Sequence, residues 1–531
     1  VVSPDWDNGS VVDVGAVTWC NGVTGLNGFV SSTNSLIGSS AGDKVGFGTN
    51  NPPDFENVVG LPNGNYVVIS SIWNNGASTS AGAVTFCNGS SGLTGTVSSA
   101  NSLVGSYSND QVGNRGIKVL ANGNYVISST QWSGGGAVSI GAATWASGLI
   151  GVNGILSSTN SLTGAVANDA FGLVVPLSNG NYVAYSRFCS IAGSVNGGAV
   201  AWGNGSTGIS GTISSANCLY GLTNYDGLNI SVFPLTNGNY VVTTNSWDNG
   251  TLINAGAVTW ADGLTGITGA ITTTNSFVGT KTDDAVGSSG IVALPDGNYL
   301  ICSDLWDNAA IANVGAVTWA DGTASLTGSI SSANSIIGTL AGDRVGENKA
   351  TVLTNGNYVI KSQRWNGNRG AVTWCDKNVP PTGTVSSANS LTGVNANDFA
   401  GNSVVALSNG NYVVACRNWD NGAILNVGAV TWCDGATATS GQINTSNSIT
   451  GTITNDNAGS LVVPLSNGHY VIASSQADIN SITDAGAVTW CNGFSATTGT
   501  VSAANSFIGT TASDGVGASI FPIPGGNYLI I

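Results

Sequence analysis

The side chains best suited to bind a metal ion are aspartates that recur at intervals of 55 to 67 residues. They are Asp43, Asp110, Asp169, Asp226, Asp284, Asp343, Asp398, Asp456 and Asp514. Calcium takes six to eight oxygen ligands, several of them carboxylates, whereas the neighbours here are mostly Asn, Ser and Gly. The alternative is an Asx-type turn, in which the carboxylate accepts backbone N–H groups. We favour the turn, expect no cofactor, and keep calcium as the alternative at these nine aspartates.

A second recurring string places a tryptophan before Asp or Asn in a short polar loop. The candidate ligand-binding residues are Trp6, Asp7, Trp73, Trp247, Asp248, Trp306, Asp307, Trp365, Trp419 and Asp420. Aromatic faces flanked by a few polar groups are typical of ligand sites, and this combination would suit a sugar. The alternative is that the rings pack between repeats, which every repeat protein needs, and that the polar residues form a turn. Packing is the favoured interpretation.

Another set of tryptophans lies inside the string Gly-Ala-Val-Thr-Trp. These are Trp19, Trp145, Trp202, Trp260, Trp319, Trp374, Trp432 and Trp490. A tryptophan within an apolar, β-branched segment is typical of a strand. We expect this second set to form the core between repeats.

The sequence contains no recognisable catalytic arrangement. The single histidine, His469, has no patterned partner, and the two glutamates, Glu56 and Glu347, share no position in the repeat. No paired-carboxylate or Ser/His/Asp pattern can be placed, so we expect a protein that is not an enzyme. A site confined to one repeat would depart from the consensus, and the largest departures are segments interpreted as insertions, at 50–57 and 377–381.

The composition excludes several classes of protein. The chain has 77 Gly, no Met, 7% charged residues and a net charge of −15. A strongly acidic surface repels phosphate backbones, so nucleic acid is not an expected partner. The sequence contains no run of 18 apolar residues, which is the length needed to span a membrane as a helix. The nine cysteines lack CxxC spacing, so we expect mainly buried free thiols. A polar surface built from Asn, Ser and Thr suits an extracellular or cell-surface location.

The whole chain is one repeat domain of nine modules, each of about 59 residues. The glycine of Gly-Ala-Val-Thr-Trp, or of its variants, falls at 15, 82, 141, 198, 256, 315, 370, 428 and 486. Each module is predicted to hold four short strands, as in Val58–Leu61, Tyr66–Ser70, Gly82–Phe86 and a last one within 95–105. Asn63-Gly64 predicts a tight turn between the first two. Apolar runs such as Tyr66–Ile69 indicate strands covered on both faces.

These motifs carry a family resemblance. Gly-Asp-x-Val-Gly (Gly42–Gly46, Gly342–Gly346), an apolar strand, Asn-Gly-Asn-Tyr-Val-Val and Gly-Ala-Val-Thr-Trp follow one another in each module. The order resembles FG-GAP repeats, which implies blades of an integrin-α-type β-propeller. The modules are also similar to repeats of large bacterial surface adhesins of the filamentous-haemagglutinin kind. The turn at Leu61–Tyr66 lacks the carboxylates of the calcium loop found in many FG-GAP blades.

We therefore expect an all-β protein, a propeller of nine four-stranded blades, with an open stacked array of the same modules in a fibre as the alternative. Both chain ends fall at the same phase of the repeat, which would fit a fragment of a longer array or a ring. The expected function is a non-enzymatic structural or adhesive region of a bacterial surface or secreted protein. The alternative is a carbohydrate-binding propeller. The expected partners are other copies, adjoining repeats or surface glycans, and not nucleic acid.

Overall fold

The computed structural model describes residues 1–48, 57–135 and 137–531, and within them the chain is almost entirely β-structure. In these three ranges the strands form seven five-stranded sheets, two four-stranded sheets and one two-stranded sheet. The chain divides into two compact units, described separately below. Unit 1 comprises Val1–Asp248, Thr259–Ser276 and Gly322–Ser325, and unit 2 comprises Asn249–Val258, Phe277–Asp321 and Leu326–Ile531.

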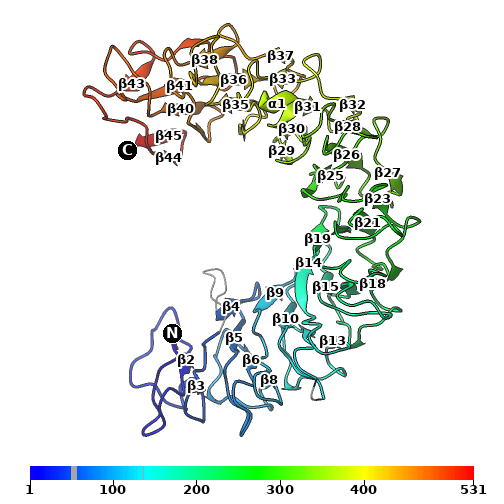
Figure 1. The fold of residues 1–531 in the computed structure, drawn as a ribbon. Helices are drawn as coiled ribbons and strands as arrows, with labels where there is room; N and C mark the ends of the chain where they lie inside the picture. Colours follow the sequence, from blue (N-terminus) through cyan, green and yellow to red (C-terminus); the bar gives the residue numbers. More distant parts are fainter. Residues whose placement is uncertain (49–56, 136) are drawn as a thin grey trace. The chain divides into compact units, whose positions relative to one another are not determined.

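Strands occupy five recurring positions in the sheets (Figure 1). The first position holds β4 (Val58–Gly60), β9 (Ile117–Val119), β14 (Leu173–Pro176), β19 (Ile230–Pro234), β24 (Gly290–Ala293), β29 (Ala350–Val352), β34 (Ser403–Ala406), β39 (Leu461–Pro464) and β44 (Ile520–Ile523). The second holds β1 (Val2–Ser3), β5 (Tyr66–Ser70), β10 (Tyr125–Ser129), β15 (Tyr182–Ser186), β20 (Tyr240–Thr244), β25 (Tyr299–Ser303), β30 (Tyr358–Ser362), β35 (Tyr412–Cys416), β40 (Tyr470–Ser474) and β45 (Asn527–Ile530).

The third position carries the Gly-Ala-Val-Thr-Trp strands and the fourth follows it in the sheet. The third holds β2 (Ala16–Thr18), β6 (Ala83–Cys87), β11 (Ala142–Ala146), β16 (Ala199–Gly203), β21 (Ala257–Ala261), β26 (Ala316–Ala320), β31 (Ala371–Cys375), β36 (Ala429–Cys433) and β41 (Ala487–Cys491). The fourth holds β3 (Ser35–Ile37), β8 (Ser102–Val104), β13 (Leu162–Thr163), β18 (Leu219–Tyr220), β23 (Phe277–Val278), β28 (Ser335–Ile337), β33 (Leu391–Thr392), β38 (Ser448–Thr450) and β43 (Ser506–Ile508).

The fifth position corrects the expectation of four strands per module and of four-stranded sheets. It holds β7 (Gly95–Thr96), β12 (Gly154–Ile155), β17 (Gly211–Thr212), β22 (Gly269–Ala270), β27 (Gly328–Ser329), β32 (Gly383–Thr384), β37 (Gly441–Gln442) and β42 (Gly499–Thr500). Each of these short strands pairs in parallel with the fourth strand of the preceding module, as when Ile336 pairs with Gly383. Consecutive modules therefore share ladder hydrogen bonds, which a pattern of four strands per module did not anticipate.

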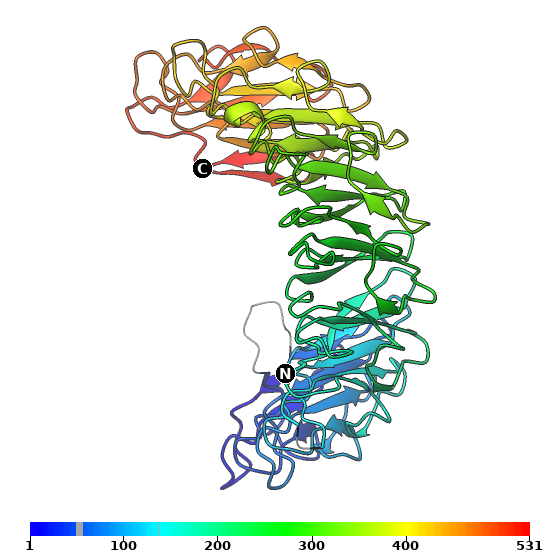
Figure 2. The same cartoon turned by 45° about the vertical axis from the view of Figure 1, so that its right-hand side comes forward.

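The sheets of unit 2 show how this arrangement is assembled. In the sheet β24-β25-β26-β28-β32 the first four strands are antiparallel, with Cys302 opposite Val317, and only β32 is parallel. In Figure 2 the green segments form successive small sheets joined by loops. Among the described residues the one helical element is α1 (Trp365–Asn368), a single turn with positive φ at Asn366 and Gly367.

The apolar core lies between consecutive sheets. In unit 2, Leu300 and Val317 of one sheet pack in the same cluster as Tyr358 and Ala371 of the next. The tyrosine that opens each second-position strand from β10 to β40 is buried at 0–1% exposure. Burial of apolar surface contributes about 25 cal/mol per Å², so packing between neighbouring sheets stabilises the fold, as expected for a repeat protein.

A buried pair of hydrogen-bonded side chains recurs within the sheets. A threonine of the third strand shares a hydrogen bond with a serine of the fourth, as between Thr318 Oγ1 and Ser335 Oγ at 2.7 Å. One module has Ala201 and Cys218 at these two positions, so both partners change together.

All nine cysteines are free thiols, and only Cys20 is exposed. Burial raises the pKa of Cys302 to about 12, which keeps that thiol protonated.

Candidate functional site

The recurring aspartates form turns that also join one module to the next. The Oδ2 atom of Asp398 accepts the backbone N–H groups of Val394 and Asn395, both at 2.7 Å. Its Oδ1 atom accepts the N–H of Asp420 at 3.0 Å. Asp420 belongs to the Trp-Asp loop of the following module, so the two sets of candidate residues meet at this contact. The same contact joins Asp284 to Asp307 and Asp226 to Asp248.

This arrangement agrees with the Asx-type turn and uses the oxygens that calcium would need. The aspartates from Asp43 to Asp456 are buried at 0–1% exposure. In the described part of the chain, no three His, Cys, Asp or Glu side chains come together as a metal site. Burial raises the pKa of five of these carboxyls, while hydrogen bonds from backbone N–H groups oppose the shift: Asp110, Asp169, Asp226, Asp284 and Asp398. At the exposed Asp514 the hydrogen bonds from Thr511 and Thr510 dominate and lower the pKa.

The tryptophans of the Trp-Asp loops are packed rather than displayed. The rings of Trp73, Trp247, Trp306, Trp365 and Trp419 are between 3 and 8% exposed. Trp6 is half-buried. Several of these indole N–H groups are buried without a hydrogen-bond partner among the described residues, including those of Trp73 and Trp419. The buried rings present no face on which a sugar could stack, and this geometry agrees with the packing interpretation.

The second tryptophan set is the more accessible one, and it lies at the edge of the core between repeats, where Trp145, Trp319, Trp374 and Trp432 pack against the buried clusters. From Trp19 to Trp432 these residues are half-buried, and Trp490 is 48% exposed. Each strand of this kind is buried at every residue except the tryptophan, as in Ala371–Cys375. The exposed candidate for aromatic recognition is therefore the tryptophan within the strand.

A set of hydrogen bonds to one glycine carbonyl, here called the latch, joins half-buried tryptophans to the next module. Trp374 Nε1 donates to the carbonyl oxygen of Gly435 in the next module at 3.0 Å. The same oxygen accepts the side-chain amides of Asn355 and Asn357, at 2.8 and 2.9 Å. These two residues come from the Asn-Gly-Asn-Tyr turn of the same module as Trp374. One carbonyl thus collects three donors from the preceding module.

The hydrogen bond from the indole to a glycine carbonyl recurs in five other repeats, and glycine is needed there because a side chain would not fit. Indole N–H groups of Trp19, Trp145, Trp202, Trp260 and Trp432 donate to Gly89, Gly205, Gly263, Gly322 and Gly493 respectively. A Cβ on Gly435 would overlap the carbonyl oxygen of Gly410. The consensus turn therefore needs glycine at this position.

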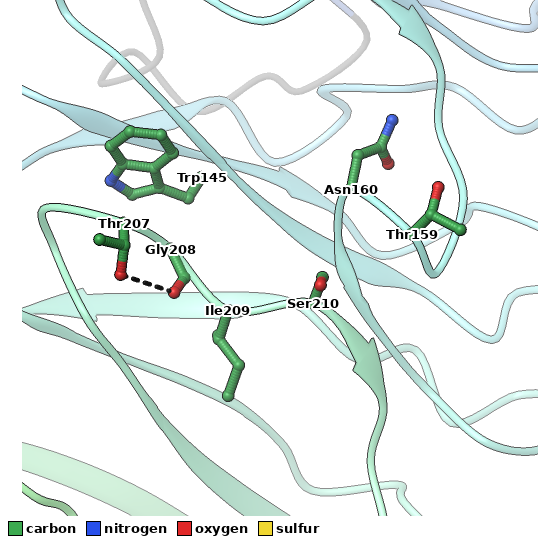
Figure 3. A pocket seen from close by; sticks show the side chains of 7 residues that line it. All are labelled: Trp145, Thr159, Asn160, Thr207, Gly208, Ile209 and Ser210. Atoms are coloured by element: carbon green, nitrogen blue, oxygen red, sulfur yellow. Dashed lines mark hydrogen bonds between the residues drawn. The ribbon is translucent and has the colours of Figure 1, made fainter.

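A cavity lies beside Trp145 in unit 1. It holds about 180 Å³ and is bounded by the indole ring, by the turn at Thr159 and Asn160, and by residues 207–210 of the next module. Figure 3 shows the ring on one side and the turn on the other, with the Thr207–Gly208 hydrogen bond below the ring. A Cβ added to Gly208 would overlap Trp145, so the glycine lets the next module pack against the indole.

The remaining reactive side chains show contacts of a structural kind. His469 Nδ1 accepts the N–H of Gly493 at 3.2 Å, in the position that an asparagine oxygen has in other modules. Glu347 forms ion pairs with Arg344 and Arg364, at 3.4 and 2.9 Å. The segment at 50–57 lies largely outside the described residues. No helix in the described part of the chain has the length and apolar character needed to cross a membrane.

These features define an all-β repeat protein whose neighbouring modules exchange strands and hydrogen bonds. The chain belongs to the family described as a repeat of unknown function, DUF5650. The family matches nine segments: residues 1–47, 60–114, 119–173, 176–229, 234–288, 293–347, 352–402, 406–460 and 464–518. This confirms the ninefold repeat predicted from the sequence, while no match to FG-GAP or adhesin families accompanies it. No curated protein matches the chain.

Similar solved structures are distant in sequence. A virginiamycin B lyase from Staphylococcus aureus is 8% identical, covering 67% of this chain and 89% of its own, with a TM-score of 0.27. A streptogramin B lyase is 9% identical, covering 67% of this chain and 90% of its own, with a TM-score of 0.26. A eukaryotic initiation factor is 11% identical, covering 72% and 88%, with a TM-score of 0.32.

Proposed function

We propose that this chain is a non-enzymatic structural or adhesive repeat region of a bacterial surface or secreted protein. The observation that carries the proposal is the use of its polar side chains. The Asp398 carboxylate accepts hydrogen bonds from three backbone N–H groups, and the Gly435 carbonyl oxygen accepts them from three side chains of the preceding module. A chain whose recurrent polar groups hold neighbours together is suited to span, display or self-association.

The partners proposed for this function are other copies of the chain or adjoining repeats, with assembly into filaments. Electron microscopy and sedimentation of the purified chain over a range of concentrations test assembly, and binding to bacterial or matrix surfaces tests adhesion. A chain that stays monomeric at high concentration and binds no such surface would refute the proposal. Turnover of glycoside or ester substrates would do the same.

We also propose that the sheets are the blades of a nine-bladed β-propeller, with an open stacked array as the alternative. Support comes from sheets that bury both faces against their neighbours and share strands in chain order. Two-dimensional class averages of the particle test this proposal directly. Nine-fold rings agree with the propeller, and extended rods agree with the stacked array.

A carbohydrate-binding function remains the second candidate. The observation that favours it is the half-buried tryptophan in each Gly-Ala-Val-Thr-Trp strand, and not the buried Trp-Asp loops. A glycan array with the wild-type chain, repeated with Trp247→Ala and Trp419→Ala, separates the two sets. Loss of a signal in those two variants would argue for the loops, and an unchanged signal would argue for the strand tryptophans.

A further inference from the structure

The residues at 377–381 correct the interpretation of this segment as an insertion. Trp374 and Gly383 are separated by nine positions, as are Trp432 and Gly441 in the next module. The segment is thus a substituted copy of the ordinary loop, such as 88–94. Lys377 replaces the latch glycine, equivalent to Gly89, and Pro380 replaces the glycine equivalent to Gly92.

These substitutions break the latch with the preceding module. In the repeats around it the indole N–H reaches the glycine carbonyl, but Trp319 Nε1 is buried without a hydrogen-bond partner among the described residues. The physical reason is steric. A Cβ at the latch position would overlap the carbonyl oxygen of the preceding turn, as at Gly435 and Gly410. The Lys377 side chain lies beside Gly356, while its backbone N–H still donates to Asn357 Oδ1 at 3.1 Å, as the Gly435 N–H does to Asn411 Oδ1.

A cavity of about 520 Å³ lies where this loop meets Trp374, entirely within unit 2. It occupies the same place in the repeat as the cavity of about 180 Å³ at Trp145. The indole ring again meets the turn before the fourth strand, here Ala388 and Asn389, and the next module contributes Ala438. The difference is the module's own loop, because Val379, Pro380 and Pro381 also line the cavity.

The lining combines one aromatic ring with apolar walls and a few polar groups at the loop. Trp374 and the two prolines provide flat apolar surface, while Asp376 and Thr382 provide a carboxylate and a hydroxyl. Asp376 Oδ1 accepts hydrogen bonds from both the backbone and the side chain of Asn378, which fixes the orientation of the carboxylate. A volume of this size lies in the range of small-ligand sites, which are mostly apolar with a few oriented polar groups.

We propose that this cavity binds a single pyranose residue of a glycan. The apolar C–H face of the sugar packs on the indole of Trp374 and against the proline rings, and its hydroxyl groups donate to the Asp376 carboxylate. The site is specific to this module, since the substitutions at Lys377, Val379 and Pro380 shape it. The inference rests on the carbohydrate-binding candidate above, which it places in one cavity, and does not depend on the structural or adhesive function.

The test uses the whole chain labelled with 5-fluorotryptophan, in which ¹⁹F NMR resolves the indoles and Trp374→Phe assigns the relevant resonance. The probes are methyl glycosides of glucose, galactose, mannose and N-acetylglucosamine, each compared with its p-nitrophenyl glycoside. We expect at least one methyl glycoside to shift the Trp374 resonance saturably and to leave Trp145 unchanged. The affinity should fall at least tenfold in Asp376→Asn.

A loop variant keeps the test independent of misfolding. Lys377→Gly with Val379→Ser and Pro380→Gly restores the residues at Gly89, Ser91 and Gly92, with which another repeat folds. We expect it to lose binding while its unfolding midpoint is unchanged or higher. Trp145→Ala is the matched control, because it removes an equivalent latch bond to Gly205 and should retain binding.

Several outcomes would overturn the proposal. One is that no methyl glycoside shifts the Trp374 resonance, and another is that only the nitrophenyl glycosides shift it. The others are an equal shift of the Trp145 resonance and undiminished sugar binding by the variant with the restored loop. Nitrophenyl-only binding would mean an apolar pocket without sugar recognition.

Discussion

Removing the carboxylate of Asp398 should destabilise the chain far more than the same change at Asp514. Both residues accept two N–H groups from the turn three and four positions before them. Asp398 is buried and also accepts the N–H of Asp420 from the next module, whereas Asp514 is exposed. The pair therefore separates the module-joining contact from the local turn.

The magnitude follows from the three donors left behind in Asp398→Ala. An unpaired buried donor costs about 1–3 kcal/mol, and a bond to a charged group is worth about 1.5–3 kcal/mol. Val394, Asn395 and Asp420 are half-buried, so water recovers part of each bond. We expect a loss of about 2–4 kcal/mol in the free energy of unfolding, with a smaller loss for Asp398→Asn because one oxygen remains.

Urea unfolding followed by tryptophan fluorescence measures these differences, with circular dichroism as the second probe because repeat arrays depart from two-state behaviour. Asp514→Ala should shift the midpoint clearly less than Asp398→Ala. Equal shifts in the two variants would refute the reasoning, since the contact with the next module would then contribute nothing. A midpoint of the wild-type chain that rises with calcium and falls with chelator would show that the aspartates bind metal and would refute the turn as their full role.

Three further predictions follow from the buried groups. Native protein at pH 8 should react with a thiol reagent at Cys20 alone, because the other eight thiols are buried and burial raises their pKa; rapid modification of further cysteines before unfolding would contradict this. Burial raises the pKa of the five aspartates named above from 3.8. The folded chain therefore binds protons more readily than the unfolded chain at these carboxyls. Their contribution to the free energy of unfolding should increase as the pH falls through the folded pKa values toward 3.8. Urea midpoints between pH 7 and 4 measure this slope, and a shallower slope is expected in Asp398→Ala. Thr318→Ala should cost about 1 kcal/mol, and adding Ser335→Cys, which reproduces the Ala201/Cys218 pair, should cost less than the two single changes summed; strict additivity in the double-mutant cycle would contradict the coupling.

The sequence was sufficient for the features that depend on local patterns. Spacing of Gly-Ala-Val-Thr-Trp predicted the ninefold repeat that the family match confirms. Tyr66–Ser70 and Gly82–Phe86 were predicted as strands and form β5 and β6, the latter shifted by one residue. The preference for a turn at the recurring aspartates also came from local chemistry, since a short carboxylate can reach backbone N–H groups three and four residues away.

The site depended on contacts that no local pattern encodes. Both tryptophan sets lie in apolar stretches of sequence. The exposure of each indole ring depends on which residues of the neighbouring sheet pack against it. Trp419 is covered, whereas Trp374 faces a loop of its own module and Ala438 of the next. The only sequence signal was the loss of glycine at Lys377 and Pro380, and its meaning needed the latch geometry.

Local sequence thus determined the repeat, the strand segments and the aspartate turns, because hydrogen-bond reach and side-chain alternation act over a few residues. Only the tertiary structure decided that Gly383–Thr384 leaves its own module for the preceding sheet and that Gly435 accepts three donors from the module before it. These contacts join residues about 45 to 80 positions apart, and they exist only when two sheets are stacked closely enough for a glycine carbonyl to meet an indole.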